Sequence, residues 1–200
     1  MLNFDFNNDY TLENDKVKLS PLKLEHVEPL ISISNEDELW TFMLEKGNGW
    51  ENLTKYILSA VNKRKFKKEY PFIVFDKVKN EFAGTTRLYE YSSELKTIKL
   101  GHTWYGKAFR GTGLNKHCKY LLFEFVFDVL KLERIGFGAH ADNKVSIAAM
   151  KSVGCKEEGV LRNFIPALIG KGRADIVLMS ILKEEWQEEW KMKLEQKLNN

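Results

Sequence analysis

The chain has 200 residues, of which 44% are hydrophobic and 30% charged, and its formal net charge is +3. That length supports one domain with a full hydrophobic core, and no apolar run approaches the roughly 20 residues that a membrane helix needs. Neither a membrane nor nucleic acid is therefore expected as a partner. The acidic start lacks the basic segment of a signal peptide, and two cysteines are too few for a disulfide framework, so a cytoplasmic location is expected.

The patterns along the chain predict helices and strands mixed within one domain. A strand over 17–23 precedes a helix beginning near Leu24, and helical spacing returns over 52–66. Strands are then expected over 70–76, 81–91 and 96–105, the last two as an antiparallel meander. A largely buried helix over 113–131, a strand over 134–140, a helix over 143–154, strands over 155–164 and 174–182, and a charged helix over 183–198 complete the chain.

Two glycines lie between the end of the predicted strand over 96–105 and the start of the buried helix predicted over 113–131. Gly111 and Gly113 flank Thr112, so little side chain would screen the backbone N–H groups there. The first turn of a helix has N–H donors without partners and the positive end of the helix dipole, which together suit an anion. An ordinary glycine-containing turn is the alternative. A Walker A loop is excluded because Thr112 follows Gly111 where lysine is needed, and Lys116 excludes a dinucleotide fingerprint.

Three segments in order resemble the GNAT acetyltransferase superfamily. RGTGLN, residues 110–115, is similar to the superfamily's loop for the pyrophosphate of acyl-CoA, with Asn115 where glycine or alanine is usual. LGHTWYGKAFRGTG and the later ADNKVSIAAMKSVGCKEEGVLR resemble the branch of ribosomal-protein N-terminal (alanine/serine) acetyltransferases, and EEW at 184–186 resembles its usual close. The resemblance covers roughly residues 17–186.

This resemblance implies the fold and the division of the chain. The expected fold is α/β, with a mixed, mostly antiparallel central sheet that is flanked by helices and splayed between two parallel strands. Residues 1–16 would form an N-terminal leader, 17–186 the N-acetyltransferase domain and 187–200 a C-terminal helix extension. Acetyl-CoA would be the co-substrate and would enter between the splayed strands, with no metal involved.

The resemblance also implies which residues hold acetyl-CoA. The pyrophosphate would lie on the backbone of Arg110, Gly111, Thr112, Gly113, Leu114 and Asn115. The pantetheine arm would pair with the backbone of the strand that contains Thr103, Trp104 and Tyr105. Asn143 and Ser146 match positions that commonly touch the cofactor, although both are also good helix-start residues whatever the ligand.

Catalysis needs a group that accepts a proton from the amine and a group that gives one to the leaving thiolate. Many members of the superfamily carry a tyrosine as general acid, but Met150 stands at that position here. Ser146 is the nearest replacement along the sequence, and solvent is the alternative.

His102 is the candidate base. Its spacing from Ile98, Leu100 and Trp104 predicts that these four residues share one face of their strand. A packed, hydrogen-bonded core histidine is the competing interpretation.

These features predict an acetyl-CoA-dependent N-acetyltransferase that works by direct attack of a primary amine in a ternary complex. The acceptor could be a protein N-terminus or a small amine. An α-amine with a pKa near 7.8 is roughly 15% neutral at pH 7, whereas a lysine side chain is less than about 0.1% neutral, so an N-terminus needs only a weak base. The competing class is a non-catalytic acyl-CoA-binding or interaction module, which Met150 favours.

The last predicted helix carries Trp186, Trp190, Leu194 and Leu198 at intervals of four residues. Tryptophans left open to water would mark an interface, so a homodimer through this helix is one expectation. The alternative is that the helix folds back on its own domain.

Overall fold

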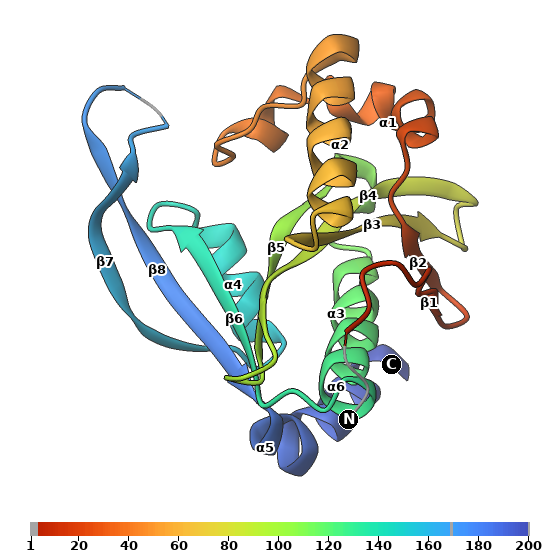
Figure 1. Cartoon of the computed structure of the whole chain (residues 1–200), viewed down its shortest axis with the longest axis vertical. Coiled ribbons are helices and arrows are strands. Elements are labelled where there is room, and N and C mark those ends of the chain that lie inside the picture. The colour runs from red at the N-terminus through yellow and green to blue at the C-terminus, as the bar shows by residue number, and fades with distance from the viewer. Residues whose placement is uncertain (1–3, 169, 200) are drawn as a thin grey trace.

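The computed structural model describes residues 4–168 and 170–199. Its strands are β1 (Leu12–Glu13), β2 (Val17–Pro21), β3 (Glu69–Asp76), β4 (Glu81–Ser92), β5 (Thr97–Tyr105), β6 (Arg134–His140), β7 (Lys156–Pro166) and β8 (Arg173–Leu182). They form one eight-stranded sheet in the order β1-β2-β3-β4-β5-β6-β8-β7 (Figure 1). Every pair is antiparallel except β5 with β6.

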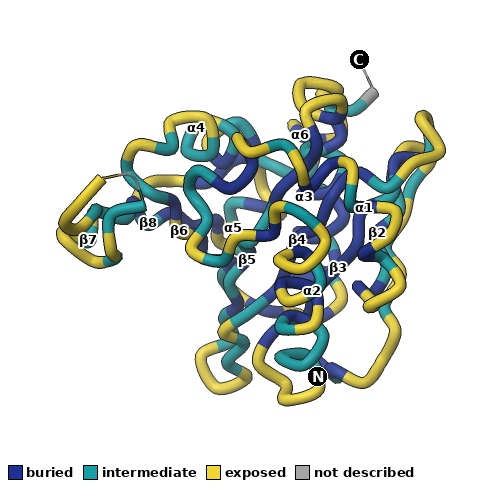
Figure 2. The backbone as a smooth tube through the Cα atoms, turned by 90° about the horizontal axis from the view of Figure 1, so that it is seen from above, coloured by how far each residue is buried: buried dark blue, intermediate teal, exposed yellow. Residues whose placement is uncertain are grey.

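Helices cover both faces of this sheet. The α-helices are α1 (Val27–Ser34), α2 (Gly49–Lys65), α3 (Leu114–Glu124), α4 (Lys144–Ser152), α5 (Lys183–Glu185) and α6 (Lys191–Asn199). Short 3-10 turns, η1 (Leu24–His26), η2 (Asp37–Trp40) and η3 (Lys107–Phe109), and π turns over Phe125–Val129 and Trp186–Trp190 link them. Seen from above, α3, α4 and α6 lie on one side of the sheet and α2 on the other (Figure 2). The α/β fold and the predicted order of elements are confirmed.

The parallel strands β5 and β6 part after a short paired stretch. Their pairing consists of Thr97 with Arg134, Ile98 with Ile135 and Lys99 with Gly136. Beyond it β6 stays paired with β8 as far as His140, and β5 stays paired with β4 as far as Tyr105. We call the gap between residues 100–105 of β5 and 137–140 of β6 the seam. It confirms the predicted splay between two parallel strands.

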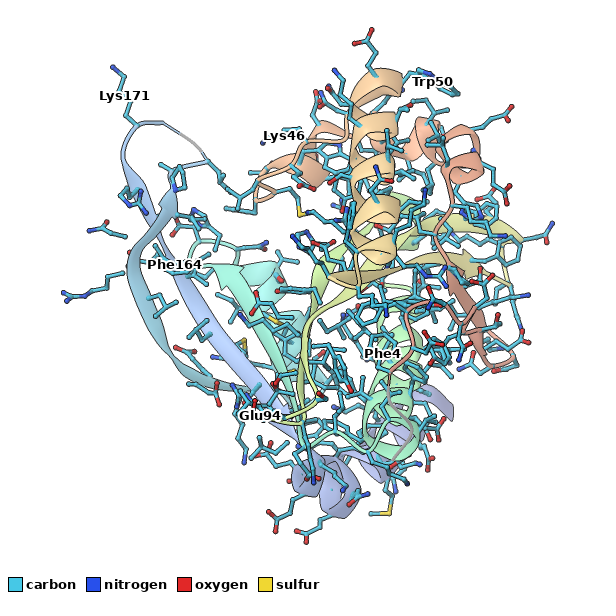
Figure 3. The ribbon with its side chains drawn as sticks, viewed as in Figure 1. Phe4, Lys46, Trp50, Glu94, Phe164 and Lys171 are labelled. Atoms are coloured by element: carbon cyan, nitrogen blue, oxygen red, sulfur yellow. The ribbon has the colours of Figure 1, made fainter. Side chains whose placement is uncertain are left out.

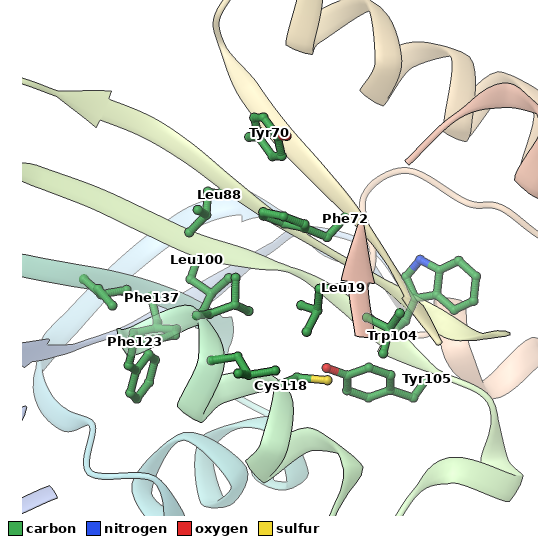
Figure 4. Packing of buried hydrophobic residues seen from close by; sticks show 14 of the residues in the cluster. Leu19, Tyr70, Phe72, Leu88, Leu100, Trp104, Tyr105, Cys118, Phe123 and Phe137 are labelled. Atoms are coloured by element: carbon green, nitrogen blue, oxygen red, sulfur yellow. The ribbon is translucent and has the colours of Figure 1, made fainter. Parts of the chain in front are cut away.

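A β-bulge in β5 corrects the expected orientation of His102. The register with β4 shifts between Arg87, opposite Gly101, and Thr85, opposite Trp104, and His102 takes a left-handed φ of 49°. One extra residue on β5 reverses the alternation of side chains from that point on. His102 therefore shares a face with Trp104 but not with Leu100, which is paired with Leu88 on the α3 side (Figure 4).

The two ends of the chain pack on the same body. Phe4 and Phe6 are buried, and the Phe4 ring lies 5.4 Å from that of Tyr70 on β3. At the other end Trp186 and Leu194 are fully buried, and Trp190 packs against Gly154 at the end of α4. The tryptophans are thus not left open to water as the dimer hypothesis assumed, because the helix folds back on its own domain. The boundaries at 16/17 and 186/187 stay predictions.

Within residues 4–168 and 170–199 no helix is long and apolar enough to cross a membrane.

Because Trp186 packs the C-terminal helix against the end of the α3 segment, replacing it should lower the stability of the protein strongly. The Trp186 ring lies 5.7 Å from that of Phe123 and 6.3 Å from that of Phe127. Removing such a buried ring leaves a cavity, so Trp186→Ala should lower the free energy of unfolding by about 3–5 kcal/mol. Met192→Ala, at a side chain that is 60% exposed, serves as the control and should change it by less than about 0.5 kcal/mol. Equal urea midpoints for the two variants would contradict the packing.

Candidate functional site

The seam leaves the facing edges of two strands without strand partners. From residue 100 of β5 and residue 137 of β6 onward, the backbone groups that face the seam pair with no strand in the part of the chain that the structure describes. Buried backbone N–H and C=O groups need hydrogen-bond partners. The seam can therefore accept an extended ligand that carries amide groups of its own.

The glycine loop, residues 110–115, lies at the start of α3. Gly111 and Gly113 have φ values of 74° and 90°, in the left-handed region that favours glycine. A Cβ atom built on either would meet nothing within 4 Å, so both positions face open space. The N–H groups of Gly111, Thr112 and Gly113 have no acceptor among the described residues. The loop therefore has the bare, outward-facing donors that a phosphate requires.

Hydrogen bonds within the glycine loop hold its shape. Thr112 Oγ1 donates to the carbonyl of Phe109 at 2.9 Å and accepts from the N–H of Leu114 at 3.4 Å. Arg110 Nε donates to the carbonyl of Tyr105 at 3.0 Å, which ties the loop to the end of β5. The side chain of Arg110 thus positions the loop against the seam, and Asn115 lies in the first turn of α3.

The three β5 residues expected to bind the cofactor line the seam with their backbone, while their side chains pack elsewhere. Trp104 is buried on the α2 side, with its ring 5.3 Å from that of Trp40. Tyr105 points to the other side, toward Cys118 of α3 (Figure 4). Thr103 is also on that side, and its hydroxyl lies 2.7 Å from that of Thr86. Any pairing of this strand with a ligand would therefore use the backbone groups that face the seam, and the Trp104 carbonyl faces β4 instead.

Asn143 and Ser146 lie at the start of α4. The side chain of Asn143 caps this helix, since its Oδ1 accepts a hydrogen bond from the N–H of Ser146 at 3.0 Å. This capping hydrogen bond is the helix-start role, which was the alternative to a cofactor contact for Asn143. Because α4 and α2 lie on opposite sides of the sheet (Figure 2), the structure does not bring Ser146 together with His102.

Met150 is buried in α4, so an apolar side chain stands at the position where the resemblance leads one to expect a tyrosine. A methionine side chain cannot donate a proton. The residue therefore packs rather than reacts.

His102 belongs to a cluster of charged residues under α2. Arg87, fully buried on β4, donates from Nη1 to Glu69 Oε2 at 2.8 Å, and its guanidinium lies 4.3 Å from the centre of the Tyr56 ring. Lys63 Nζ lies 3.1 Å from Glu69 Oε1 and 3.2 Å from Glu45 Oε1. Sequence analysis missed this polar cluster, because its members come from separate strands and helices.

The polar cluster determines the charge of His102. Burial lowers the pKa of His102 to about 4, and the positive charge of Arg87 adds to that effect. Burial acts to raise the pKa of Glu69, but hydrogen bonds and the charge of Arg87, with the help of Lys63, hold it below its usual value. At neutral pH the imidazole is therefore uncharged, which is the form that can accept a proton.

A cavity of about 410 Å³ opens beyond the end of β6. It is lined by Phe42 from the segment after η2, by His140, Ala141 and Asp142, and by Ala167, Lys171, Arg173, Ala174 and Asp175 of the β7–β8 hairpin. Figure 3 shows Lys171 at the tip of this hairpin and Lys46 on the other side of the opening. The walls carry both signs of charge, so the cavity can receive a polar group near the seam.

Comparisons with known proteins agree with this geometry. Residues 16–156 match the family model of the acetyltransferase (GNAT) domain. The chain is 24% identical over 157 residues to the "Probable N-acetyltransferase YjcK" of Bacillus subtilis (strain 168), which covers 76% of this chain and 86% of that protein.

Two solved structures share the fold. A GCN5-related N-acetyltransferase from Brucella melitensis superimposes with a TM-score of 0.86 at 23% identity, covering 96% of this chain and 86% of the other. Mycobacterium smegmatis RimJ in complex with CoA-disulfide does so with a TM-score of 0.77 at 19% identity, covering 94% and 93%.

The low pKa of His102 predicts how stability depends on pH. Between the ordinary pKa of 6.5 and the folded-state value of about 4, the unfolded chain binds a proton that the folded protein does not. Stability therefore falls as the pH is lowered through this window. Going from pH 7 to pH 5 should cost the wild type about 2 kcal/mol more than His102→Gln, as measured by urea unfolding. An identical pH dependence in the two proteins would contradict this burial of His102.

Proposed function

The chain belongs to the GNAT acetyltransferase family, and from that premise we propose that it transfers the acetyl group of acetyl-CoA to a primary amine. The observation that carries the proposal is the seam, which opens directly beside the glycine loop. The loop offers donors for a pyrophosphate, and the strand edges offer partners for the amide groups of a pantetheine arm. RimJ, which shares the fold, binds CoA-disulfide and so supports this assignment.

Acetyl-CoA would supply an acetyl group activated as a thioester. The residues of this chain would hold it in three ways. The backbone of residues 110–115 would bind the pyrophosphate, the backbone of residues 103–105 would align the arm along β5, and the N-terminal turn of α4, with Asn143 and Ser146, would border the seam from the β6 side. Direct attack then needs only that an amine reach the open end of the seam.

His102 is the residue we propose as proton acceptor. It lies at the bulge of β5, where the strand borders the seam, and its imidazole is uncharged at neutral pH. A base with a pKa of about 4 is weak, and it suits an amine that is already partly neutral at pH 7. This favours an α-amine, such as a protein N-terminus or an amino compound of similar basicity, over a lysine side chain.

The acceptor would reach the seam through the cavity beyond β6. Lys171, Arg173, Asp142 and Asp175 all line this cavity, so it can bind an acceptor that carries charges of both signs around its amine. A homodimer and a cytoplasmic location stay predictions.

The competing function is a non-catalytic module that binds acyl-CoA without turning it over. Met150 favours it, because no proton donor stands at that position of α4. The two functions make the same prediction for binding and opposite predictions for turnover.

Binding is tested at the glycine loop. A valine at residue 113 would be strained at φ 90° and would put its side chain into the space offered to the pyrophosphate. Gly113→Val should therefore weaken acetyl-CoA binding at least tenfold, or about 1.4 kcal/mol, by calorimetry.

Gly49→Val is the matched control for this variant. Gly49 also starts a helix, has a φ of 77° and faces open space, but it lies at the start of α2, away from the loop. It should lose stability as Gly113→Val does and keep its affinity. Unchanged affinity in Gly113→Val would overturn the cofactor assignment.

Turnover is tested with a panel of N-terminal peptides and small amines. The wild type should acetylate at least one class, and His102→Gln should lower kcat by roughly a hundredfold or more while sparing affinity for acetyl-CoA. A near-normal kcat together with a lowered Tm would instead show that His102 is a packing residue. Binding without turnover of any amine would establish the non-catalytic module.

A further inference from the structure

Lys119 is a lysine that the proposed reaction has not yet used. It lies in α3, and its side chain is only 5% exposed. Its Nζ lies 3.4 Å from Thr103 Oγ1 on β5 and 5.9 Å from the centre of the Phe137 ring on β6. Thr103 and Phe137 both lie beyond the last paired residues of the two strands. The amine of Lys119 therefore sits in the angle where β5 and β6 part, on the α3 side of the seam.

Among the residues that the structure describes, no negative charge faces this amine. Within residues 4–168 and 170–199 no carboxylate forms an ion pair with Lys119, and the titratable groups that act on it are Cys118 of α3 and Cys155, just before β7. Burial raises the pKa of each of these thiols to about 12, so both are neutral at physiological pH. Tyr105, which lies beside Cys118, has a pKa raised well above its usual value by burial and is neutral as well.

A buried ammonium without a counter-ion is costly, and burial lowers the pKa of Lys119 to about 8. Groups with strongly shifted pKa values cluster at functional sites. In the proposed reaction one anion arises inside the seam, namely the thiolate that leaves the acetyl carbon. The ammonium of Lys119 is opposite in sign to that thiolate, and it lies under the seam in which the thiolate would form.

Resting on the proposed function, we propose that Lys119 is the general acid that protonates the leaving thiolate. The bond from the acceptor nitrogen to the carbonyl carbon forms, and the carbon–sulfur bond breaks with its electron pair going to sulfur. Lys119 gives one proton from Nζ to that sulfur. The acceptor amine releases its own proton to His102 or to solvent, and Lys119 is reprotonated from solvent before the next turnover, so charge and protons balance.

Two features of the site suit this role. A thiol has an ordinary pKa of about 8.5, close to the value of about 8 for Lys119, so a proton moves between them with little cost in free energy. Thr103 Oγ1 is bonded to Thr86 Oγ1 at 2.7 Å and lies next to Nζ, so the pair of hydroxyls positions the amine. Lys119 would thus supply from α3 the proton that Met150 cannot supply from α4.

The test measures the thiol of bound CoA, which does not require turnover. The ultraviolet absorbance of the thiolate is followed against pH in the CoA complex, with desulfo-CoA giving the background from the protein's own thiols and tyrosines. A nearby ammonium stabilises a thiolate, so the pKa of the bound thiol should be at least about one unit lower in the wild type than in Lys119→Met. Lys193→Met removes the same charge from the exposed face of α6 and should behave as the wild type.

Lys119→Met is expected to fold, because an apolar side chain of similar length replaces an unpaired buried charge. Its Tm should equal or exceed that of the wild type. In the same variant kcat should fall about a hundredfold or more with little change in the KM for acetyl-CoA. Equal thiol pKa values in the wild type and Lys119→Met, with CoA bound to both, would overturn this proposal alone. A wild type that binds no CoA would overturn the proposed function, and this proposal with it.

Discussion

Only Thr97, Ile98 and Lys99 of β5 pair with β6, and beyond them each strand is held by its other neighbour. Antiparallel pairing with β8 keeps β6 straight to His140, while β5 follows β4. The close approach of β4 is possible because residue 84 is glycine: a Cβ there would lie 1.9 Å from the carbonyl oxygen of Trp104. The seam is thus enforced by contacts on both sides, and the glycine loop, tied to Tyr105 through Arg110, is aligned with it.

The bulge at His102 divides the chemistry of the site between the two faces of the sheet. His102 and Trp104 face α2 and the polar cluster, whereas Thr103 faces α3 and Lys119. A group that accepts a proton and a group that donates one can therefore border the same seam without contacting each other. In the proposed reaction the amine loses its proton to His102 on the α2 side of the sheet, and the thiolate receives a proton from Lys119 on the α3 side. Each side has its own electrostatic environment.

Segments outside the motifs provide that environment. The C-terminal helix covers α3: Trp186 packs on Phe123 and Phe127, and Lys191 bonds to Asp128 at 2.8 Å. Much of α3 is buried in this way, as its three consecutive buried residues Leu121, Leu122 and Phe123 show. The low dielectric around Lys119 follows from this burial.

By itself the sequence determined the order of the elements, the glycine loop and the family likeness, because these rest on local periodicity and on short motifs in order along the chain. Only the tertiary structure decided on which face His102 lies, since one extra residue at the bulge reverses every side chain after it. It also assembled Arg87, Glu69 and Lys63, and it placed Lys119 beside Thr103. Those contacts join residues 6 to 18 positions apart in sequence on different elements, and the fold-back of the C-terminal helix likewise depends on a surface of α3 that no local pattern describes. Charge and burial are properties of such assembled surroundings, and for that reason the buried lysine was visible only once the chain had folded.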